Sequence, residues 1–225
     1  MIHHMIKPKA CLFDLDGVLI DSEPLHGKAW TLTAKTFNFN LTGNQLKLLQ
    51  GRTRVDCAKL LQDWIGKSIN FKELIDIHQP ISRKMLSEAK PMPGAKVLVE
   101  WCYQNRIPLA LVTSSSNESM RNKIKPHPWI ELIPTKIVGD HALLSKGKPS
   151  PDPYLLASQE LNVDPKDCWV IEDSISGTQS ANAAGCTVWV LNNEGEEIKN
   201  TTSSSRVKHI KHLVDLLKEL KGFNQ

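Results

Sequence analysis

Four short apolar segments, separated by longer stretches of helical periodicity, set the pattern of the chain. They are rich in β-branched or bulky residues and cover residues 10–13, 109–112, 169–171 and 187–191. Such runs are typical of strands buried on both faces of a parallel sheet. Between the last two, a helix of small residues is expected over 174–184, ending at Gly185, a residue type that suits a left-handed C-cap. This β-α-β spacing predicts an α/β fold with a doubly wound parallel sheet.

The stretch from about Glu23 to Lys90 differs, because it has helical patterns and no convincing strand. Helices are expected from Pro24 onward and over 46–50, 54–65 and 71–89. Pro80 is expected to kink or split the last helix, since proline lacks an N–H donor and clashes with the preceding turn. The proline-rich segment 90–94 reads as a hinge back to the core. We therefore predict a core of residues 1–22 and 93–225 with an inserted helical cap domain, residues 23–92.

Composition indicates an ordinary globular protein, with 225 residues, 40% hydrophobic and 23% charged. No apolar run reaches the roughly 20 residues of a membrane helix and the start lacks a signal-peptide pattern, so a cytoplasmic protein without membrane attachment is expected. The net charge of +4 is spread along the chain, which gives little support to nucleic-acid binding. The densest basic stretch, 206–211, is expected to be the solvated entrance to an amphipathic C-terminal helix. The five scattered cysteines are expected to be mostly buried free thiols, not disulfides or a zinc site.

Polar clusters follow the strand ends, and the first contains Asp14 and Asp16, followed by Gly17. In a doubly wound fold, ligands bind beyond the carboxyl ends of the strands. One carboxylate there can attack phosphorus, while a second acts as general acid and base. Taken alone, two aspartates ending a strand are more often loop or cap residues.

The second and third clusters offer donors to a phosphate. Residues 113–117 follow the second strand with hydroxyls and backbone N–H groups at a helix start, which can cradle a phosphate. Simple N-capping by serine explains the same residues. Lys148 stands between Gly147 and Pro149. A lone lysine is normally solvated, but one fixed by rigid neighbours could neutralise phosphoryl oxygens.

The fourth cluster, Glu172 and Asp173, ends the third strand with adjacent carboxylates. Mg²⁺ prefers oxygen ligands and is commonly held by one or two carboxylates. Asp14, Asp173 and a backbone carbonyl of the first loop would provide such a site. The competing interpretation is that Glu172 and Asp173 cap the next helix.

The four clusters occur together and in order, as DLDGVLIDSE, LVTSSS, GKPSPDPY and IEDSISG. In this the chain resembles the haloacid dehalogenase-like (HAD) superfamily, specifically its branch with a helical cap between the first two motifs, and the resemblance covers nearly the whole chain. It implies a Rossmann-like core and roles for the cluster residues. The implied catalytic residues are Asp14 as nucleophile and Asp16 as general acid and base; the implied phosphate ligands are Thr113, Ser114 and Lys148; the implied Mg²⁺ ligands are Asp14, the Asp16 carbonyl and Asp173, with Glu172 supporting or sharing that role.

Within the superfamily, Asp16 argues against a dehalogenase, which lacks this second aspartate, and against a phosphonatase, which uses a cap lysine. The remaining choice is between a phosphatase and a mutase resembling β-phosphoglucomutase. His26 and Arg54 match mutase positions that serve acid–base gating and distal phosphate binding, although helix packing or surface exposure explains His26 as well. The mutase has a lysine in place of Gln50, and related phosphatases share the segment 21–25. We therefore favour a phosphatase.

The expected substrate is a small phosphorylated metabolite, first of all a sugar or polyol phosphate, and the resemblance implies a monomer. A catalytically inactive protein that binds phosphorylated ligands is a further alternative, although every required core residue is present. A phospho-accepting receiver domain lacks a helical insertion of this size. Residues 1–5 are assigned no role.

Overall fold

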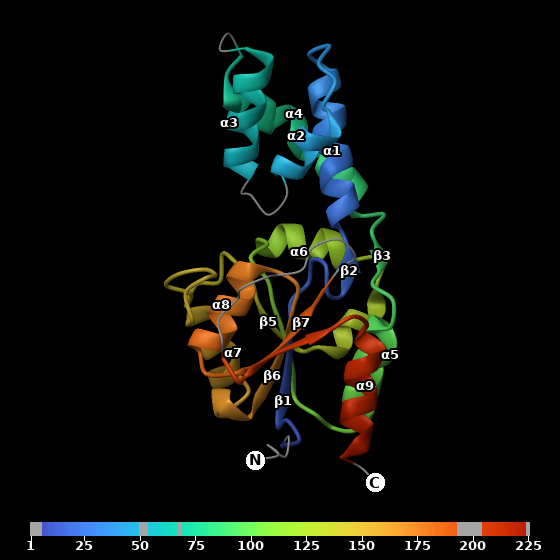
Figure 1. Cartoon of the computed structure of the whole chain (residues 1–225), viewed down its shortest axis with the longest axis vertical. Coiled ribbons are helices and arrows are strands. Elements are labelled where there is room, and N and C mark those ends of the chain that lie inside the picture. The colour runs from blue at the N-terminus through green and yellow to red at the C-terminus, as the bar shows by residue number, and fades with distance from the viewer. Residues whose placement is uncertain (1–5, 50–53, 67–68, 193–203, 224–225) are drawn as a thin grey trace. The chain divides into compact units, whose positions relative to one another are not determined.

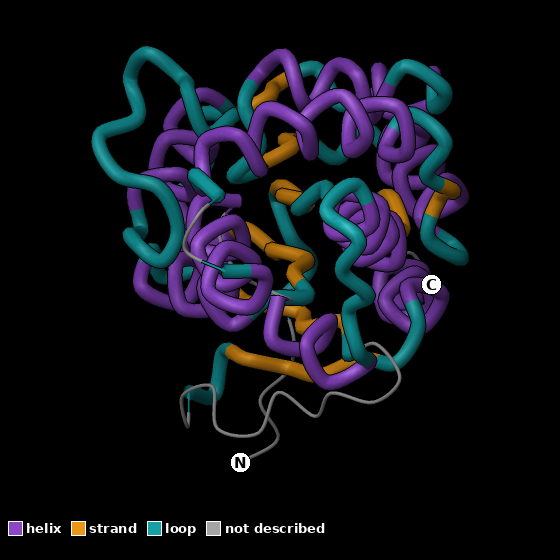
Figure 2. The backbone as a smooth tube through the Cα atoms, turned by 90° about the horizontal axis from the view of Figure 1, so that it is seen from above, coloured by secondary structure: helices purple, strands orange, loops and turns teal. Residues whose placement is uncertain are grey.

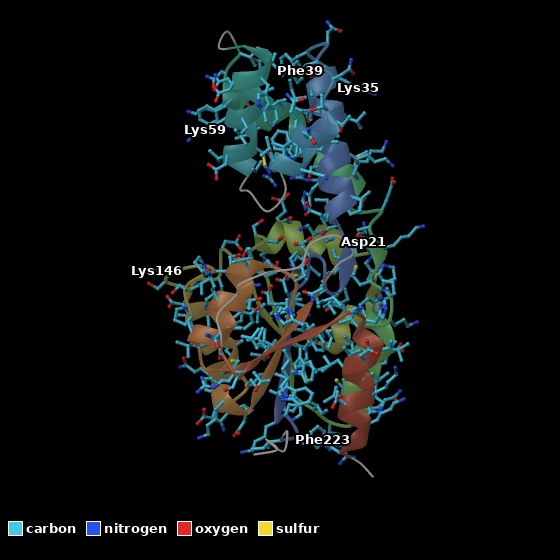
Figure 3. The ribbon with its side chains drawn as sticks, in the orientation of Figure 1. Asp21, Lys35, Phe39, Lys59, Lys146 and Phe223 are labelled. Carbon is cyan, nitrogen blue, oxygen red and sulfur yellow. The ribbon has the colours of Figure 1, made fainter. Side chains whose placement is uncertain are left out.

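The computed structural model describes residues 6–49, 54–66, 69–192 and 204–223. The chain forms two compact units, a core of Met1–Ile20 with Pro91–Gln225 and a helical unit of Asp21–Lys90. Asp21, labelled in Figure 3, is therefore the first residue of the helical unit. No helix in the described ranges is long and apolar enough to cross a membrane.

The described part of the core contains a six-stranded parallel sheet in the order β5-β4-β1-β6-β7-β8 (Figure 1). Its strands are β1 (Ala10–Phe13), β4 (Leu109–Val112), β5 (Thr135–Ile137), β6 (Cys168–Glu172), β7 (Thr187–Leu191) and β8 (Val207–Ile210). β1 lies in the middle, with Cys11 paired to Leu109 of β4 and to Trp169 of β6. The four predicted strands and the α/β fold class are thus confirmed, whereas β5 and β8 were not predicted.

Residues 207–210 of the basic stretch 206–211 form a strand, so the interpretation of this stretch as the entrance to a helix was wrong. Val207–Ile210 pairs with β7 at one end of the sheet, and the next helix begins only at Leu213. An edge strand keeps part of its surface in water, so Lys208 and His209 are compatible with it.

Helices flank both faces of the sheet (Figures 1 and 2). They are α5 (Ala95–Gln104) and α9 (Leu213–Gly222) on one face, and α7 (Asp152–Glu160) and α8 (Ile175–Ala183) on the other. Neighbouring strand residues point to opposite faces. Accordingly, Val170 joins the apolar core that includes Tyr154 of α7, whereas Trp169 packs against Trp189 and Phe223.

Other details of the core agree with the sequence analysis. The helix predicted over 174–184 is α8, and Gly185 behind it has a positive φ of 92°. All five cysteines are free and buried, as predicted. The described part of the core also contains α6 (Asn117–Ile124) and the short 3₁₀ turns η1 (Pro128–Leu132) and η2 (Pro165–Asp167).

The helical unit contains α1 (Glu23–Lys35), α2 (Gly43–Leu49), α3 (Arg54–Ile65) and α4 (Phe71–Leu86). These helices share an apolar core that includes Trp30, Leu61 and Leu74, against which Phe39 packs (Figure 3). Where the chain passes between the units, β2 (Ile20–Asp21) pairs with β3 (Lys90–Pro91).

α4 continues through Pro80, so of the two outcomes expected there, a kink or a split, the split does not occur. Proline removes one backbone hydrogen bond. The helix also buries a stripe at helical spacing, Leu74, His78, Ser82 and Leu86, and Asn70 caps its start by accepting a hydrogen bond from the Lys72 N–H at 2.9 Å. Most helical stability in proteins comes from packing of such a face.

Candidate active site

The candidate site is built on the carboxyl ends of β1, β4 and β6, which are neighbours in the sheet. Asp14 directly follows β1, and its N–H donates to the Ile171 carbonyl of β6 at 3.0 Å. Its carboxylate is largely buried and accepts a hydrogen bond from Lys148 Nζ at 2.7 Å. Parallel strands thus bring residues far apart in sequence to one edge of the sheet.

Lys148 has an acceptor for each of its three ammonium protons. Besides Asp14, Nζ donates to Glu172 Oε1 at 2.5 Å and to the Val112 carbonyl, at the end of β4, at 3.0 Å. Burial lowers the pKa of Lys148, but the charges of Asp14 and Glu172 outweigh this and raise the pKa above its usual value. Lys148 is therefore a fixed cation, whereas Lys146 in the same loop is exposed and projects away from the core (Figure 3).

Glu172, the last residue of β6, is fully buried and held by several donors. The hydroxyl of Tyr154 donates to Oε1 at 2.5 Å, and the hydroxyl of Ser174 donates to Oε2 at 3.0 Å. Burial, together with the charge of Glu172, raises the pKa of Tyr154 well above its usual value, so the phenol stays protonated and can donate. Tyr154, on α7, thus orients Glu172 as well as filling the core.

The carboxylates of Asp14, Glu172 and Asp173 form a set of candidate metal ligands, with one oxygen of each within 4.8 Å of the others. Burial, reinforced by the neighbouring carboxylates and partly opposed by Lys148, raises the pKa of Asp14 to about 7 and that of Asp173 to about 9. A hard divalent cation such as Mg²⁺ takes carboxylate oxygens as donors, and its charge favours the ionised form of such crowded groups. The donor set therefore fits Mg²⁺.

Gly17 makes room for this carboxylate set. Its φ is +77°, and a Cβ atom there would lie 1.7 Å from Asp173 Oδ2. A side chain at position 17 would thus collide with a candidate metal ligand.

Asp16 has a partner that the sequence analysis did not identify. Lys123 Nζ lies 2.7 Å from both carboxylate oxygens of Asp16, and the Ser115 hydroxyl donates to Oδ2 at 3.2 Å. The available signal was the placement of Lys123 between Met120 and Ile124 on the buried face of α6, where an apolar residue is the usual choice.

The turn after β4 carries the predicted phosphate ligands. Thr113 is buried, and its Oγ1 accepts from the Ser115 N–H at 3.1 Å, while Ser114 is exposed. Ser116 caps α6 by accepting from the Ser119 N–H at 3.3 Å. N-capping therefore accounts for Ser116 but not for Thr113 or Ser114.

The sequence profile of haloacid dehalogenase-like hydrolases matches residues 11–191, which include all four clusters. The chain belongs to this family. Hexitol phosphatase A of Escherichia coli is 34% identical over 194 residues, covering 83% of this chain and 84% of that protein. The phosphorylated carbohydrates phosphatase of Thermotoga maritima is 31% identical over 180 residues, covering 79% and 82%. The crystal structure of a haloacid dehalogenase family hydrolase from Entamoeba histolytica superposes with a TM-score of 0.77, with 29% identity, covering 96% of this chain and 99% of that one.

The two predicted cap residues of this haloacid dehalogenase-like hydrolase lie in the helical unit, His26 on α1 and Arg54 at the start of α3. The charges of both residues affect the pKa of His78 on α4. His78 is buried, and its ring stacks on that of Trp30 with ring centroids 3.7 Å apart. Burial, then the charges of Arg54 and His26, lower the pKa of His78 to about 3. His78 was not predicted, and Gln50, the position at which the mutase has a lysine, lies outside the described residues.

Proposed function

We propose that the protein is a Mg²⁺-dependent phosphatase that hydrolyses a sugar or polyol phosphate through an aspartyl-phosphate on Asp14. The observation that carries this proposal is the contact between the Lys148 ammonium and Asp14, beside the carboxylates of Asp173 and Glu172. The names of the hexitol and phosphorylated carbohydrates phosphatases, which share about a third of their residues with the chain, support the substrate class. The insertion of residues 21–90 is proposed to act as the cap over the site.

In the first step, a carboxylate oxygen of Asp14 attacks phosphorus, and the bond from phosphorus to the ester oxygen breaks. Asp16 donates a proton to the leaving oxygen. An anionic nucleophile approaches an anionic phosphoryl group here, so the Lys148 cation offsets the repulsion, and Thr113 and Ser114 bind phosphoryl oxygens. Asp14, the Asp16 carbonyl and Asp173, with Glu172 supporting them, would hold Mg²⁺, which would supply further positive charge.

In the second step, water attacks the phosphorus of the aspartyl-phosphate. Asp16, now a carboxylate, takes the proton from this water, and the bond from phosphorus to Asp14 breaks. Inorganic phosphate leaves and Asp14 returns to its starting form. The enzyme therefore needs Asp16 in two protonation states during each turnover.

A phosphosugar mutase is the second candidate, because the helical unit places His26 and Arg54 within electrostatic reach of the same residue, His78. A basic group in a cap can bind a second phosphate, as a mutase requires. In that case a sugar hydroxyl, instead of water, accepts the phosphoryl group.

The decisive experiment measures phosphate release from a panel of sugar, polyol and short-acid phosphates with Mg²⁺, including β-glucose 1-phosphate assayed in parallel for glucose 6-phosphate. Steady release that is lost with EDTA and restored by Mg²⁺ supports the phosphatase. Conversion of the sugar phosphate with little free phosphate assigns the mutase instead. Binding of phosphate analogues without turnover of any ester indicates an inactive phospho-ligand binder.

Asp14→Asn tests the nucleophile. We expect turnover to fall by at least about 10³-fold, because an amide does not attack phosphorus, while circular dichroism stays unchanged. Labelled phosphate from the substrate should be trapped on the wild-type protein and not on this variant. Lys146→Ala, in the same loop as Lys148 but exposed, serves as the matched control and should retain full activity. Normal turnover by Asp14→Asn contradicts the mechanism.

A further inference from the structure

The Lys123 ammonium and the Asp16 carboxylate form a closed arrangement with the Ser115 hydroxyl. Lys123 Nζ is 2.7 Å from each Asp16 oxygen and 2.9 Å from Ser115 Oγ. The Ser115 hydroxyl in turn donates to Asp16 Oδ2. An ammonium has three protons, and here each has an acceptor, while both Asp16 oxygens are occupied by a donor.

Burial is distributed unequally between the two charged partners. The Lys123 side chain is 3% exposed, whereas that of Asp16 is 30% exposed. Placing a lysine on the buried face of α6 costs free energy unless its charge is paired and hydrogen-bonded. The Lys123 side chain is therefore held inside the protein. The Asp16 carboxylate is partly exposed, so a reacting group can reach it.

We propose that Lys123 is a positioning residue for Asp16: it fixes the orientation of the carboxylate that takes the proton from the attacking water. The loss of Lys123 then slows hydrolysis of the aspartyl-phosphate more than its formation from an ester with a good leaving group. This inference rests on the proposed function, because it assigns Lys123 to the second step of that reaction.

The two steps can be separated by the choice of ester. With p-nitrophenyl phosphate, the bond from phosphorus to the phenolic oxygen breaks and nitrophenolate leaves as a stable anion, so the first step needs no proton from Asp16. In the second step, water attacks phosphorus, Asp16 takes the proton, and the bond to Asp14 breaks. Only this step depends on a correctly oriented Asp16 carboxylate.

The test is rapid-mixing kinetics of Lys123→Met with p-nitrophenyl phosphate and Mg²⁺. We expect a burst of nitrophenolate approaching one per protein molecule at close to the wild-type rate, followed by a steady rate about 10–100-fold below wild type, the usual loss for a supporting contact. Rapid acid quenching should show that the phosphoenzyme accumulates. A general loss of folding would lower the burst amplitude instead.

Three further variants separate positioning from a structural role. Lys125→Met, the same substitution at an exposed position two residues along, should behave as wild type. Lys123→Arg, which keeps the cation, should recover much of the steady rate. The double variant Asp16→Asn, Lys123→Met should have nearly the same steady rate as Asp16→Asn alone, because Lys123 acts through Asp16. If Lys123→Met does not fold, Lys123→Gln, which keeps a donor, takes its place with the same expectations.

The outcomes distinguish this inference from the proposed function. A wild-type protein that hydrolyses no ester contradicts the proposed function itself. An active wild type, together with a Lys123→Met variant of unchanged steady rate, overturns only the role of Lys123. Equal losses in the burst and steady phases, or full additivity with Asp16→Asn, also overturn it.

Discussion

At the scale of single residues, Gly17 controls how closely two carboxylate-bearing segments approach. It lies between Asp16 and Val18 in the loop after β1, and the space of its missing side chain is filled by the Asp173 carboxylate. Its positive φ adds a second requirement, because residues with a Cβ rarely adopt this backbone conformation.

Gly17→Ala should therefore destabilise the protein and impair the site. Backbone strain alone should lower the free energy of unfolding by about 1–3 kcal/mol, and the collision with Asp173 should lower it further. Urea unfolding measures the stability, and phosphate release measures the activity. Gly27→Ala, inside α1, is the matched control. A Cβ atom at Gly27 would meet nothing nearer than Leu46 Cδ2, at 4.0 Å. That change should stabilise helix α1 by about 0.5–1 kcal/mol. Unchanged stability and activity in Gly17→Ala would show that the loop relaxes freely.

The sequence was sufficient to place Asp14, Glu172 and Asp173 at strand ends, because parallel strands bring their carboxyl ends to one edge. It was not sufficient to find Lys123 or the hydroxyl contact of Tyr154. Both depend on a long side chain reaching from a helix to a strand end, and such a reach has no local signature in the sequence. The roles of the predicted site residues stay predictions until the variants are measured.

At the scale of elements, α4 carries a buried histidine that is held in its neutral form. His78 Nδ1 lies 3.2 Å from Thr33 Oγ1, which also lies 2.9 Å from the Ala29 carbonyl oxygen. Which of Nδ1 and Oγ1 donates depends on the tautomer of the neutral ring. Burial, with Arg54 and His26, lowers the pKa of His78 to about 3.

The helical unit should lose stability as the pH falls below the pKa of an unfolded histidine, about 6.5. Between that value and the folded pKa of His78, the unfolded chain binds a proton that the folded unit does not, so acid favours unfolding. One such proton changes the free energy of unfolding by about 1.4 kcal/mol per pH unit in this window. Hydrogen exchange of α1 and α4 peptides at several pH values measures the effect in this unit alone.

His78→Phe provides the comparison, because it retains a ring against Trp30 but cannot take up a proton. Its exchange should depend less on pH than that of the wild type between pH 6.5 and 4. An equally steep dependence in both proteins would assign the effect to other groups. The measurement thus isolates one titrating side chain from the background of surface charges.

The elements that escaped sequence prediction are those with weak patterns. β5 is only three residues long, and β8 alternates apolar with basic residues at a sheet edge. Neither forms the continuous apolar run by which the central strands were recognised. The central strands β1 and β6 are buried on both faces, and their apolar runs, 10–13 and 169–171, carried that signal.

At the scale of the whole molecule, the crowded carboxylates of the site predict that a bound cation stabilises the core. Asp14, Glu172 and Asp173 lie close together, and Lys148 forms ion pairs with Asp14 and Glu172. A ligand that binds only the folded state stabilises it by about 2.7 kcal/mol at a hundred times its Kd. Mg²⁺ should therefore raise the Tm of the protein.

This expectation is measured by thermal unfolding in EDTA and in increasing Mg²⁺. Asp173→Asn, which removes one anionic donor, should lose most of the Mg²⁺-dependent rise in Tm. Asp152, an acidic residue at the start of α7, provides the control, since Asp152→Asn should keep the rise. An equal rise in Asp173→Asn would mean that the metal binds elsewhere.

The position of β1 in the sheet has a consequence for the order in which the chain acquires structure. β1 is paired on both sides, but its partners β4 and β6 follow the helical insertion in sequence. During synthesis, the helical unit is thus complete while β1 still lacks both neighbours. Contacts of such large sequence separation form slowly, and exposed strand edges promote aggregation in the meantime. The insertion therefore prolongs the time for which the nascent chain carries an unpaired apolar strand, the segment that a chaperone would be expected to hold.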